Sequence, residues 1–234
     1  MIQNKDDFYL SINKEELSGL RQAHFSGEIV VVDKVENVPA AVDTLRKERL
    51  IGFDTETKPS FKRGHSNMVS LIQLSTENVC FLFRLNEIGF DHRLRELLED
   101  ENVIKIGASV HDDFLNLKRL QDFNPEGFID IQQYVKQFKI EDNSLARIYG
   151  ILFNERISKN QRLTNWEQST LTSGQQSYAA LDAYACLKIF KFLKNGEFNP
   201  SASPFLHHPE ENEEAAALPA MASANGSAEN AVKN

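Results

Sequence analysis

Apolar residues alternate between strand-like and helix-like spacing from residue 28 to residue 193. Short runs rich in β-branched and aromatic residues predict strands at residues 28–32, 50–54, 69–74, 79–83, 103–106 and 128–131. Apolar positions three or four apart predict helices at residues 38–50, 92–98, 113–120 and 174–193. The start of the last helix is well defined, because Thr172 and Gln175 have the spacing of a capping box.

The order of these elements predicts an α/β fold with a mixed sheet. The turn-like residues 75–78 join two strands into a hairpin, and alternating helices and strands follow. Such an order places helices on both faces of one sheet. We therefore expect a single domain at residues 28–196, preceded by an N-terminal extension at residues 1–27.

The end of the chain has a different composition. Residues 197–234 are rich in Ala, Ser, Pro, Asn and Glu, which predicts a disordered acidic tail. Six acids and one base give this segment a net charge of −5, within a total of −8. Nucleic-acid binders usually carry a basic footprint, so the composition alone does not indicate one.

Other features bear on the compartment. No run approaches the roughly 18 apolar residues of a transmembrane helix, and the charged N-terminus lacks the apolar stretch of a signal peptide. Cys80 and Cys186 lie in apolar surroundings without CxxC spacing. They are typical of buried thiols in a reducing compartment, so we expect a cytoplasmic protein.

Two pairs of side chains and one short segment suggest chemistry. Asp54 and Glu56 lie two residues apart at the end of an apolar strand, so both project to the same side. Two such carboxylates repel each other unless a cation lies between them. Tyr178 and Asp182 share one face of the last predicted helix. Taken alone, each pair is better explained without a metal, as an exposed strand end or as an exposed Asp beside a packed Tyr.

The segment after the strand at residues 103–106 contains two adjacent acids. Gly107 ends the strand, and a helix is predicted to start near Asp112 and Asp113. An acid at a helix start is commonly a cap, so one of the pair serves either as a cap or as a ligand.

Together these motifs resemble the DEDD superfamily of 3′–5′ exonucleases, in the ribonuclease D and Werner-type branch. The resemblance runs from about residue 28 to residue 193. Asp54-Thr55-Glu56 matches the first motif, and the spacing of Gly107, Asp113 and Leu117 matches the second, which favours Asp113 over Asp112. Tyr178 and Asp182 match the YxxxD motif of the DEDDy subgroup. Lesser matches are Asp130, Ser144-Leu145 at the start of a short helix, and Asn165-Trp166.

The resemblance implies a ribonuclease H-like mixed sheet and a function. It implies that Asp54, Glu56, Asp113 and Asp182 bind two divalent cations, Mg²⁺ or Mn²⁺, and that Tyr178 orients the attacking water. The expected reaction is hydrolysis of terminal phosphodiester bonds at a free 3′ end of DNA or RNA, with release of nucleoside 5′-monophosphates. Two bound cations would neutralise the four carboxylates, so the acidic composition does not exclude a polyanionic substrate.

Residues for substrate contact are less sharply indicated. The segment at residues 57–67 combines bases and aromatics, which favours phosphate contact and base stacking. The segment at residues 156–166 also contains Lys159. The candidates in these two segments are Lys58, Phe61, Arg63, His65, Arg162 and Trp166. A solvated loop for the first segment, and a packed side chain for Trp166, are equally compatible. The alternative function is a catalytically silent nucleic-acid-binding or scaffold protein, which predicts a missing metal ligand.

Overall fold

A six-stranded mixed sheet forms the centre of the molecule. The computed structural model describes residues 7–60 and 67–209. The strands are β3 (Glu28–Val32), β4 (Leu50–Thr57), β5 (Val69–Ser75), β6 (Val79–Arg84), β7 (Ile104–Gly107) and β8 (Phe128–Asp130). They are arranged in the order β3-β6-β5-β4-β7-β8. Strands β4, β5 and β6 pair antiparallel, whereas β3 with β6, β4 with β7, and β7 with β8 pair parallel. The predicted mixed sheet and its hairpin are therefore confirmed.

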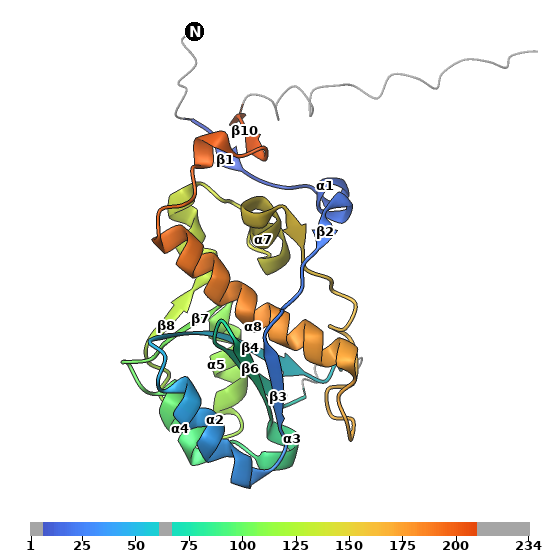
Figure 1. Cartoon of the computed structure of the whole chain (residues 1–234), viewed down its shortest axis with the longest axis vertical. Coiled ribbons are helices and arrows are strands. Elements are labelled where there is room, and N and C mark those ends of the chain that lie inside the picture. The colour runs from blue at the N-terminus through green and yellow to red at the C-terminus, as the bar shows by residue number, and fades with distance from the viewer. Residues whose placement is uncertain (1–6, 61–66, 210–234) are drawn as a thin grey trace, which may run out of the picture.

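Helices cover both faces of this sheet, as predicted (Figure 1). On one face, α2 (Val38–Leu45), α4 (His92–Leu98) and α5 (Val110–Lys118) pack on Phe53 and its apolar neighbours. On the other face lies the long helix α8 (Ser173–Lys194), whose capping box of Thr172 and Gln175 is present as expected. The short α3 (Leu85–Ile88) and the 3₁₀ turn η1 (Val35–Asn37) lie beside the first layer.

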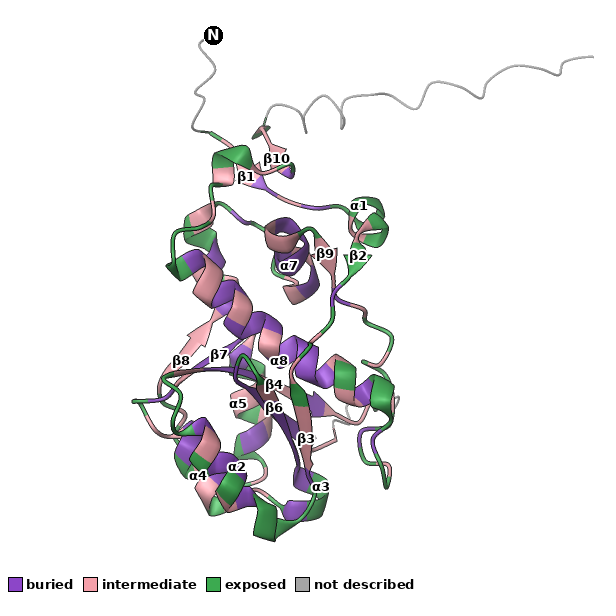
Figure 2. Ribbon diagram, in the orientation of Figure 1, coloured by how far each residue is buried: buried purple, intermediate pink, exposed green. Residues whose placement is uncertain are grey.

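Helix α8 is buried along most of its length (Figure 2). Its middle turns pack directly on β4, because Gly52 leaves no side chain between them. A Cβ at Gly52 would lie 1.9 Å from the carbonyl oxygen of Ala183. This close approach brings the first half of α8 beside the end of β4.

A second group of elements packs beside the C-terminal half of α8. It comprises α6 (Ile131–Tyr134), η2 (Val135–Phe138), α7 (Leu145–Phe153) and the N-terminal elements β1 (Tyr9–Leu10), α1 (Lys14–Gly19) and β2 (Arg21–Gln22). Strand β2 pairs parallel with β9 (Glu155–Arg156). Residues 7–27 are thus part of the folded body.

The beginning of the expected tail is also folded. Residues 200–202 form η3 (Pro200–Ala202), and β10 (Leu206–His207) pairs antiparallel with β1. The Phe205 side chain is buried, and its carbonyl oxygen accepts a hydrogen bond from the Ser11 amide. The prediction of disorder from residue 197 is therefore wrong for residues 197–209, because the partner strand that orders them lies near the other end of the sequence. Residues 210–234 lie outside the described residues.

Within the described parts of the chain, no helix has both the length and the apolar character needed to cross a membrane.

Candidate active site

Three carboxylates meet where β4 and α8 come together. Asp54 and Glu56 project from the same side of β4, and Asp182 projects from α8. One oxygen from each lies within 4.8 Å of the other two. Glu56 and Asp182 are 8% and 7% exposed, and Asp54 is half-buried. A register shift in the β4–β5 pairing follows directly after Glu56. Bulges of this kind re-aim side chains next to active sites.

The cluster is electrostatically unfavourable without a cation. Burial, and then the charges of Asp182, Asp113 and Glu56, raise the pKa of Asp54 well above its usual value. Burial and the charges of Asp182 and Asp113 raise the pKa of Glu56 to about 8. Closely spaced carboxylate oxygens with little solvent are the donors that hard divalent cations prefer. The chemistry of the cluster therefore fits a divalent-cation site.

Asp113 approaches the cluster from the opposite helix layer. The Thr55 hydroxyl donates a hydrogen bond to the Asp113 carboxylate at 2.5 Å. Burial raises the pKa of Asp113 to about 7, although the bond from Thr55 opposes this shift. The neighbouring Asp112 is exposed. The geometry thus favours Asp113 as the residue facing the site, as its spacing predicts.

Neither acid is the cap of α5. The helix starts at Val110 rather than at residue 113, and the carboxylate of Asp130 accepts hydrogen bonds from the amides of Ser109 and Val110. Asp130 ends β8, so a strand neighbour fixes the start of the helix that holds Asp113. The sequence indicates Asp130 only through its match to the family motif, and it does not indicate the contact of Thr55 with Asp113. The signal for Thr55 was its place between Asp54 and Glu56, which turns it to the opposite face of β4.

Tyr178 lies one turn before Asp182 on α8, as the sequence predicts. Burial raises the pKa of Asp182 to about 7, and the nearby Tyr178 hydroxyl opposes this shift. Burial, followed by the charges of Asp182 and Glu56, raises the pKa of the Tyr178 hydroxyl far above its usual value. The hydroxyl therefore stays protonated at neutral pH, so it is a donor at the edge of the cluster.

The predicted substrate contacts have different outcomes. Trp166 is fully buried against apolar residues, 6.0 Å from the Tyr178 ring, so the prediction that it contacts substrate is wrong and its packing interpretation is the correct one. Lys58 forms an ion pair with Glu167 at 3.0 Å. Arg162 is exposed, and its charge opposes the rise in the pKa of Glu56 that burial and the neighbouring acids cause. Phe61, Arg63 and His65 lie outside the described residues.

A small pocket adjoins the cluster. It has a volume of about 140 Å³ and is bordered by Lys159, Arg162, Tyr178 and Asp182 among others. The charge of Lys159 acts to lower the pKa of Asp182. Two cationic side chains therefore face the buried acids from one loop, residues 158–162.

Comparison with known proteins agrees with this geometry. A family model described as 3′-5′ exonuclease matches residues 29–196. The chain belongs to the 3′–5′ exonuclease family. The resemblance to DEDD-type exonucleases that the sequence motifs indicate is thereby confirmed.

Relatives of this exonuclease family occur in longer proteins. The chain is 32% identical over 170 residues to the mouse "Bifunctional 3'-5' exonuclease/ATP-dependent helicase WRN", which covers 70% of this chain and 12% of the mouse protein. It is 29% identical over 163 residues to an Arabidopsis thaliana "3'-5' exonuclease", which covers 66% of this chain and 57% of that protein. The chain thus spans from about an eighth to just over half of these two relatives.

Solved exonuclease domains share the fold. The Nibbler EXO domain of Aedes aegypti superposes with a TM-score of 0.64 at 23% identity, covering 77% of this chain and 94% of that one. Ribonuclease D of Escherichia coli superposes with a TM-score of 0.63 at 21% identity, covering 73% and 44% of the two chains. The ribonuclease H-like fold that the sequence implies is therefore confirmed.

Proposed function

We propose that this chain is an active 3′–5′ exonuclease that removes nucleotides from DNA or RNA with a free 3′ end. The observation that supports it best is the cluster of Asp54, Glu56 and Asp182, with Tyr178 one helical turn before Asp182 on α8. A silent relative would lack one of the family's acids, whereas this chain has an acid at each motif position, namely Asp54, Glu56, Asp113 and Asp182. The family of the chain supports the reaction, and the acidic cluster supports the need for a metal.

The proposed reaction is hydrolysis of the last phosphodiester bond. The oxygen of a water molecule forms a bond to the phosphorus, and the bond from phosphorus to the 3′ oxygen of the preceding nucleotide breaks. That oxygen leaves as the new 3′ hydroxyl after it takes up a proton, and the product is a nucleoside 5′-monophosphate. Two divalent cations, Mg²⁺ or Mn²⁺, would supply charge neutralisation and activation of the water.

The side chains of this chain have separable roles in that proposal. Asp54, Glu56 and Asp182 would hold one cation, and Asp113 together with Asp54 would hold the second. The Tyr178 hydroxyl, which lies one helical turn from Asp182, would orient the water. Lys159 and Arg162 would hold the phosphate of the substrate, since both border the pocket that contains Asp182.

A cytoplasmic location is part of the same proposal. Its support is that Cys80 and Cys186 are both free and buried, as expected of thiols in a reducing compartment.

Release of mononucleotides from a 3′-labelled oligonucleotide tests the activity. Matched DNA and RNA substrates, single-stranded or recessed, are incubated with Mg²⁺ or Mn²⁺. We expect labelled 5′-monophosphates from the native chain and none from Asp54→Ala. Asp112→Ala is the matched control and should retain activity, because that side chain is exposed beside Asp113. Binding of oligonucleotides without release, under either metal and on every substrate, would instead support the silent binding protein.

A further inference from the structure

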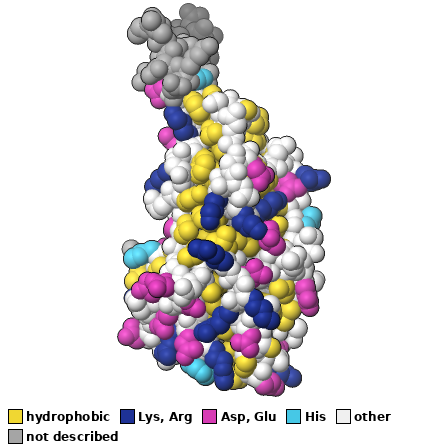
Figure 3. Space-filling model, turned by 60° about the vertical axis from the view of Figure 1, so that its left-hand side comes forward, with side chains coloured by type: hydrophobic (Ala, Val, Ile, Leu, Met, Phe, Trp, Pro, Cys, Tyr) yellow, Lys and Arg dark blue, Asp and Glu magenta, His cyan; other side chains and the backbone are white. Residues whose placement is uncertain are grey.

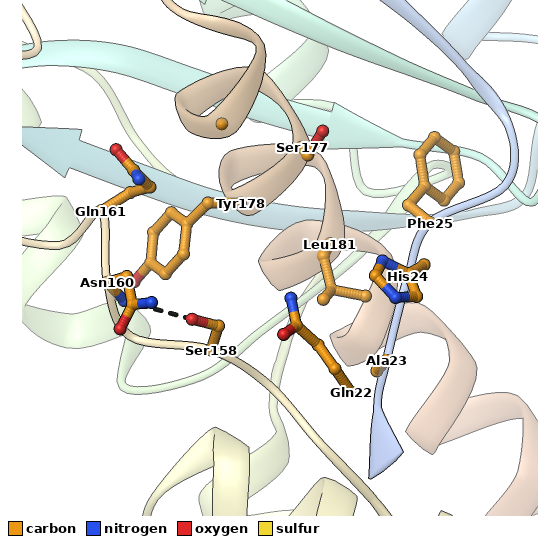
Figure 4. A pocket seen from close by; sticks show the side chains of 11 residues that line it. Gln22, Ala23, His24, Phe25, Ser158, Asn160, Gln161, Ser177, Tyr178 and Leu181 are labelled. Carbon is orange, nitrogen blue, oxygen red and sulfur yellow. Dashed lines mark hydrogen bonds between the residues drawn. The ribbon is translucent and has the colours of Figure 1, made fainter.

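A larger cavity lies on the other side of Tyr178. It has a volume of about 330 Å³, within the range of roughly 300–1,000 Å³ typical of small-ligand sites. Three segments surround it: residues 22–25, the loop at residues 158–161, and the first turns of α8 (Figure 4). Tyr178 borders both this cavity and the small pocket that contains Asp182. The cavity therefore adjoins the proposed catalytic site without containing any of its acids.

The wall formed by residues 22–25 is held in place before any ligand binds. The Ala23 side chain is 2% exposed, and its amide donates a hydrogen bond to the Arg156 carbonyl oxygen at 2.9 Å. Phe25 packs on Tyr184 with 5.0 Å between ring centroids. The family model begins at residue 29, so this wall lies outside the part of the chain that the model matches.

The lining is polar and nearly uncharged. Gln22, Asn160 and Gln161 bring amides, Ser158 and Ser177 bring hydroxyls, and the rings of Phe25 and Tyr178 add aromatic surface. Among the described residues that line the cavity, none is an Asp, Glu, Lys or Arg, and His24 adds an imidazole ring. Amides and hydroxyls pair with the donors and acceptors on the edge of a base, and aromatic rings pack on its face.

The loop at residues 158–162 lies between the small pocket and the larger cavity. Lys159 and Arg162 border the pocket with Asp182, whereas Asn160 and Gln161 border the cavity. Adjacent residues of one loop thus face a site suited to phosphate and a site suited to a neutral ring. A nucleic-acid strand carries both groups within one nucleotide.

We propose that this cavity binds a nucleobase of the substrate strand next to the scissile phosphodiester bond. The proposal rests on the proposed exonuclease function for the identity of the strand. The N-terminal extension would then contribute directly to substrate binding, through Gln22 and its neighbours, and not only to stability.

Direct binding tests the cavity without metal or turnover. The full chain in EDTA is titrated with adenosine and, separately, with ribose 5-phosphate, which carries sugar and phosphate but no base. Saturation-transfer NMR reports which ligand protons contact the protein. We expect adenosine to bind through its base and the double variant Gln22→Leu/Gln161→Leu to bind it about tenfold more weakly, because two neutral hydrogen bonds are lost. Gln133→Leu, an exposed glutamine on α6 outside the cavity, is the control.

Kinetics test the place of the base in the strand. The double variant should raise the KM for an oligonucleotide with kcat little changed. An abasic nucleotide at the terminal or the penultimate position should remove this difference between variant and native chain, because both changes delete the same contact. Adenosine bound no better than ribose 5-phosphate, or bound equally by the double variant, would overturn the proposal. Since the NMR titration needs no activity, its failure and a failure of the exonuclease function are distinguishable.

Discussion

Each acid of the cluster has a carboxyl group that binds its proton more tightly in the folded chain than in the unfolded chain. The pKa of Glu56 is raised from 4.5 to about 8, and those of Asp113 and Asp182 from 3.8 to about 7. Burial is the main cause for all three. Without a metal, ionisation of these carboxyl groups therefore destabilises the fold, and bound divalent cations would offset the repulsion between them.

The raised pKa values of these carboxyl groups predict that the stability of the fold depends on pH. A raised pKa contributes stability that is fully present below the unfolded pKa and is lost as the pH rises through the folded pKa. In EDTA, the free energy of unfolding from urea titrations should therefore fall from about pH 5 to about pH 8, the window set by these shifted pKa values. Mn²⁺ should restore it at the higher pH by binding the folded state. If the free energy of unfolding in EDTA stays constant across this window, the carboxyl groups of the site do not have raised pKa values.

Tyr178 has a different role from the acids, because its hydroxyl donates and does not carry charge. Tyr178→Phe should lower kcat by about a hundredfold, the effect expected when a reacting group is misplaced by about 1 Å. The Mn²⁺ concentration for half-maximal activity should change little, since the carboxylates are intact. A loss of metal affinity in proportion to the loss of kcat would show that the hydroxyl supports the cation site instead.

At the scale of elements, the site depends on the contact between β4 and α8. Gly52→Ala would place a Cβ 1.9 Å from the Ala183 carbonyl oxygen, a backbone atom that cannot move aside alone. We expect a loss of about 3 kcal/mol or more in unfolding free energy, comparable to severe overpacking of a core. Activity should fall further than stability explains, because Asp182 moves away from Asp54.

Gly19→Ala is the matched control for that substitution. Gly19 ends α1, and a Cβ there would meet no atom within 4 Å. Its free energy of unfolding should be unchanged or rise slightly, since alanine favours the helix. Equal thermal and urea midpoints for Gly52→Ala and Gly19→Ala would show that the β4–α8 contact is not as tight as the structure has it.

The same elements show what could be predicted from the sequence. The shared direction of Asp54 and Glu56, and of Tyr178 and Asp182, follows from the periodicity of one strand and one helix, so it could be predicted. The start of α5 could not, because Asp130 of another strand caps it. Burial of Trp166 also depends on residues distant in sequence, among them Leu71 and Leu82.

Pairings between distant segments escaped prediction for the same reason. Tyr9 lies opposite His207 across the β1–β10 pair, and each strand is only two residues long, too short for the sequence alone to indicate it. The meeting of Asp113 with the other acids needed the family pattern, because nothing local distinguishes it from Asp112. Local pattern thus predicted the main strands and helices, the cap of α8 and two pairs of site residues, whereas long-range contacts determined the start of α5, the folded terminal segments and the packing around Tyr178.

At the scale of the whole molecule, the net charge of −8 opposes the approach of a nucleic acid. Acidic and basic side chains are interspersed over the face shown in Figure 3. Affinity for the strand must therefore come from local groups. Among the described residues, Lys159 and Arg162 border the acidic site and are suited to this task.

Salt dependence measures that local contribution. Neutralising one phosphate of a single strand contributes about −0.7 to the slope of log affinity against log salt concentration. In an Asp54→Asn background, which prevents hydrolysis, Arg162→Gln should therefore make this slope about 0.7 shallower for a 5′-labelled oligonucleotide. Lys47→Gln, an exposed residue that follows α2 on the opposite side of the sheet from α8, should leave the slope unchanged. If both variants reduce the slope equally, affinity comes from the overall field and not from the loop beside Asp182. A change confined to Arg162 would mean that an acidic protein binds its polyanion through a few cations placed next to the reacting bond.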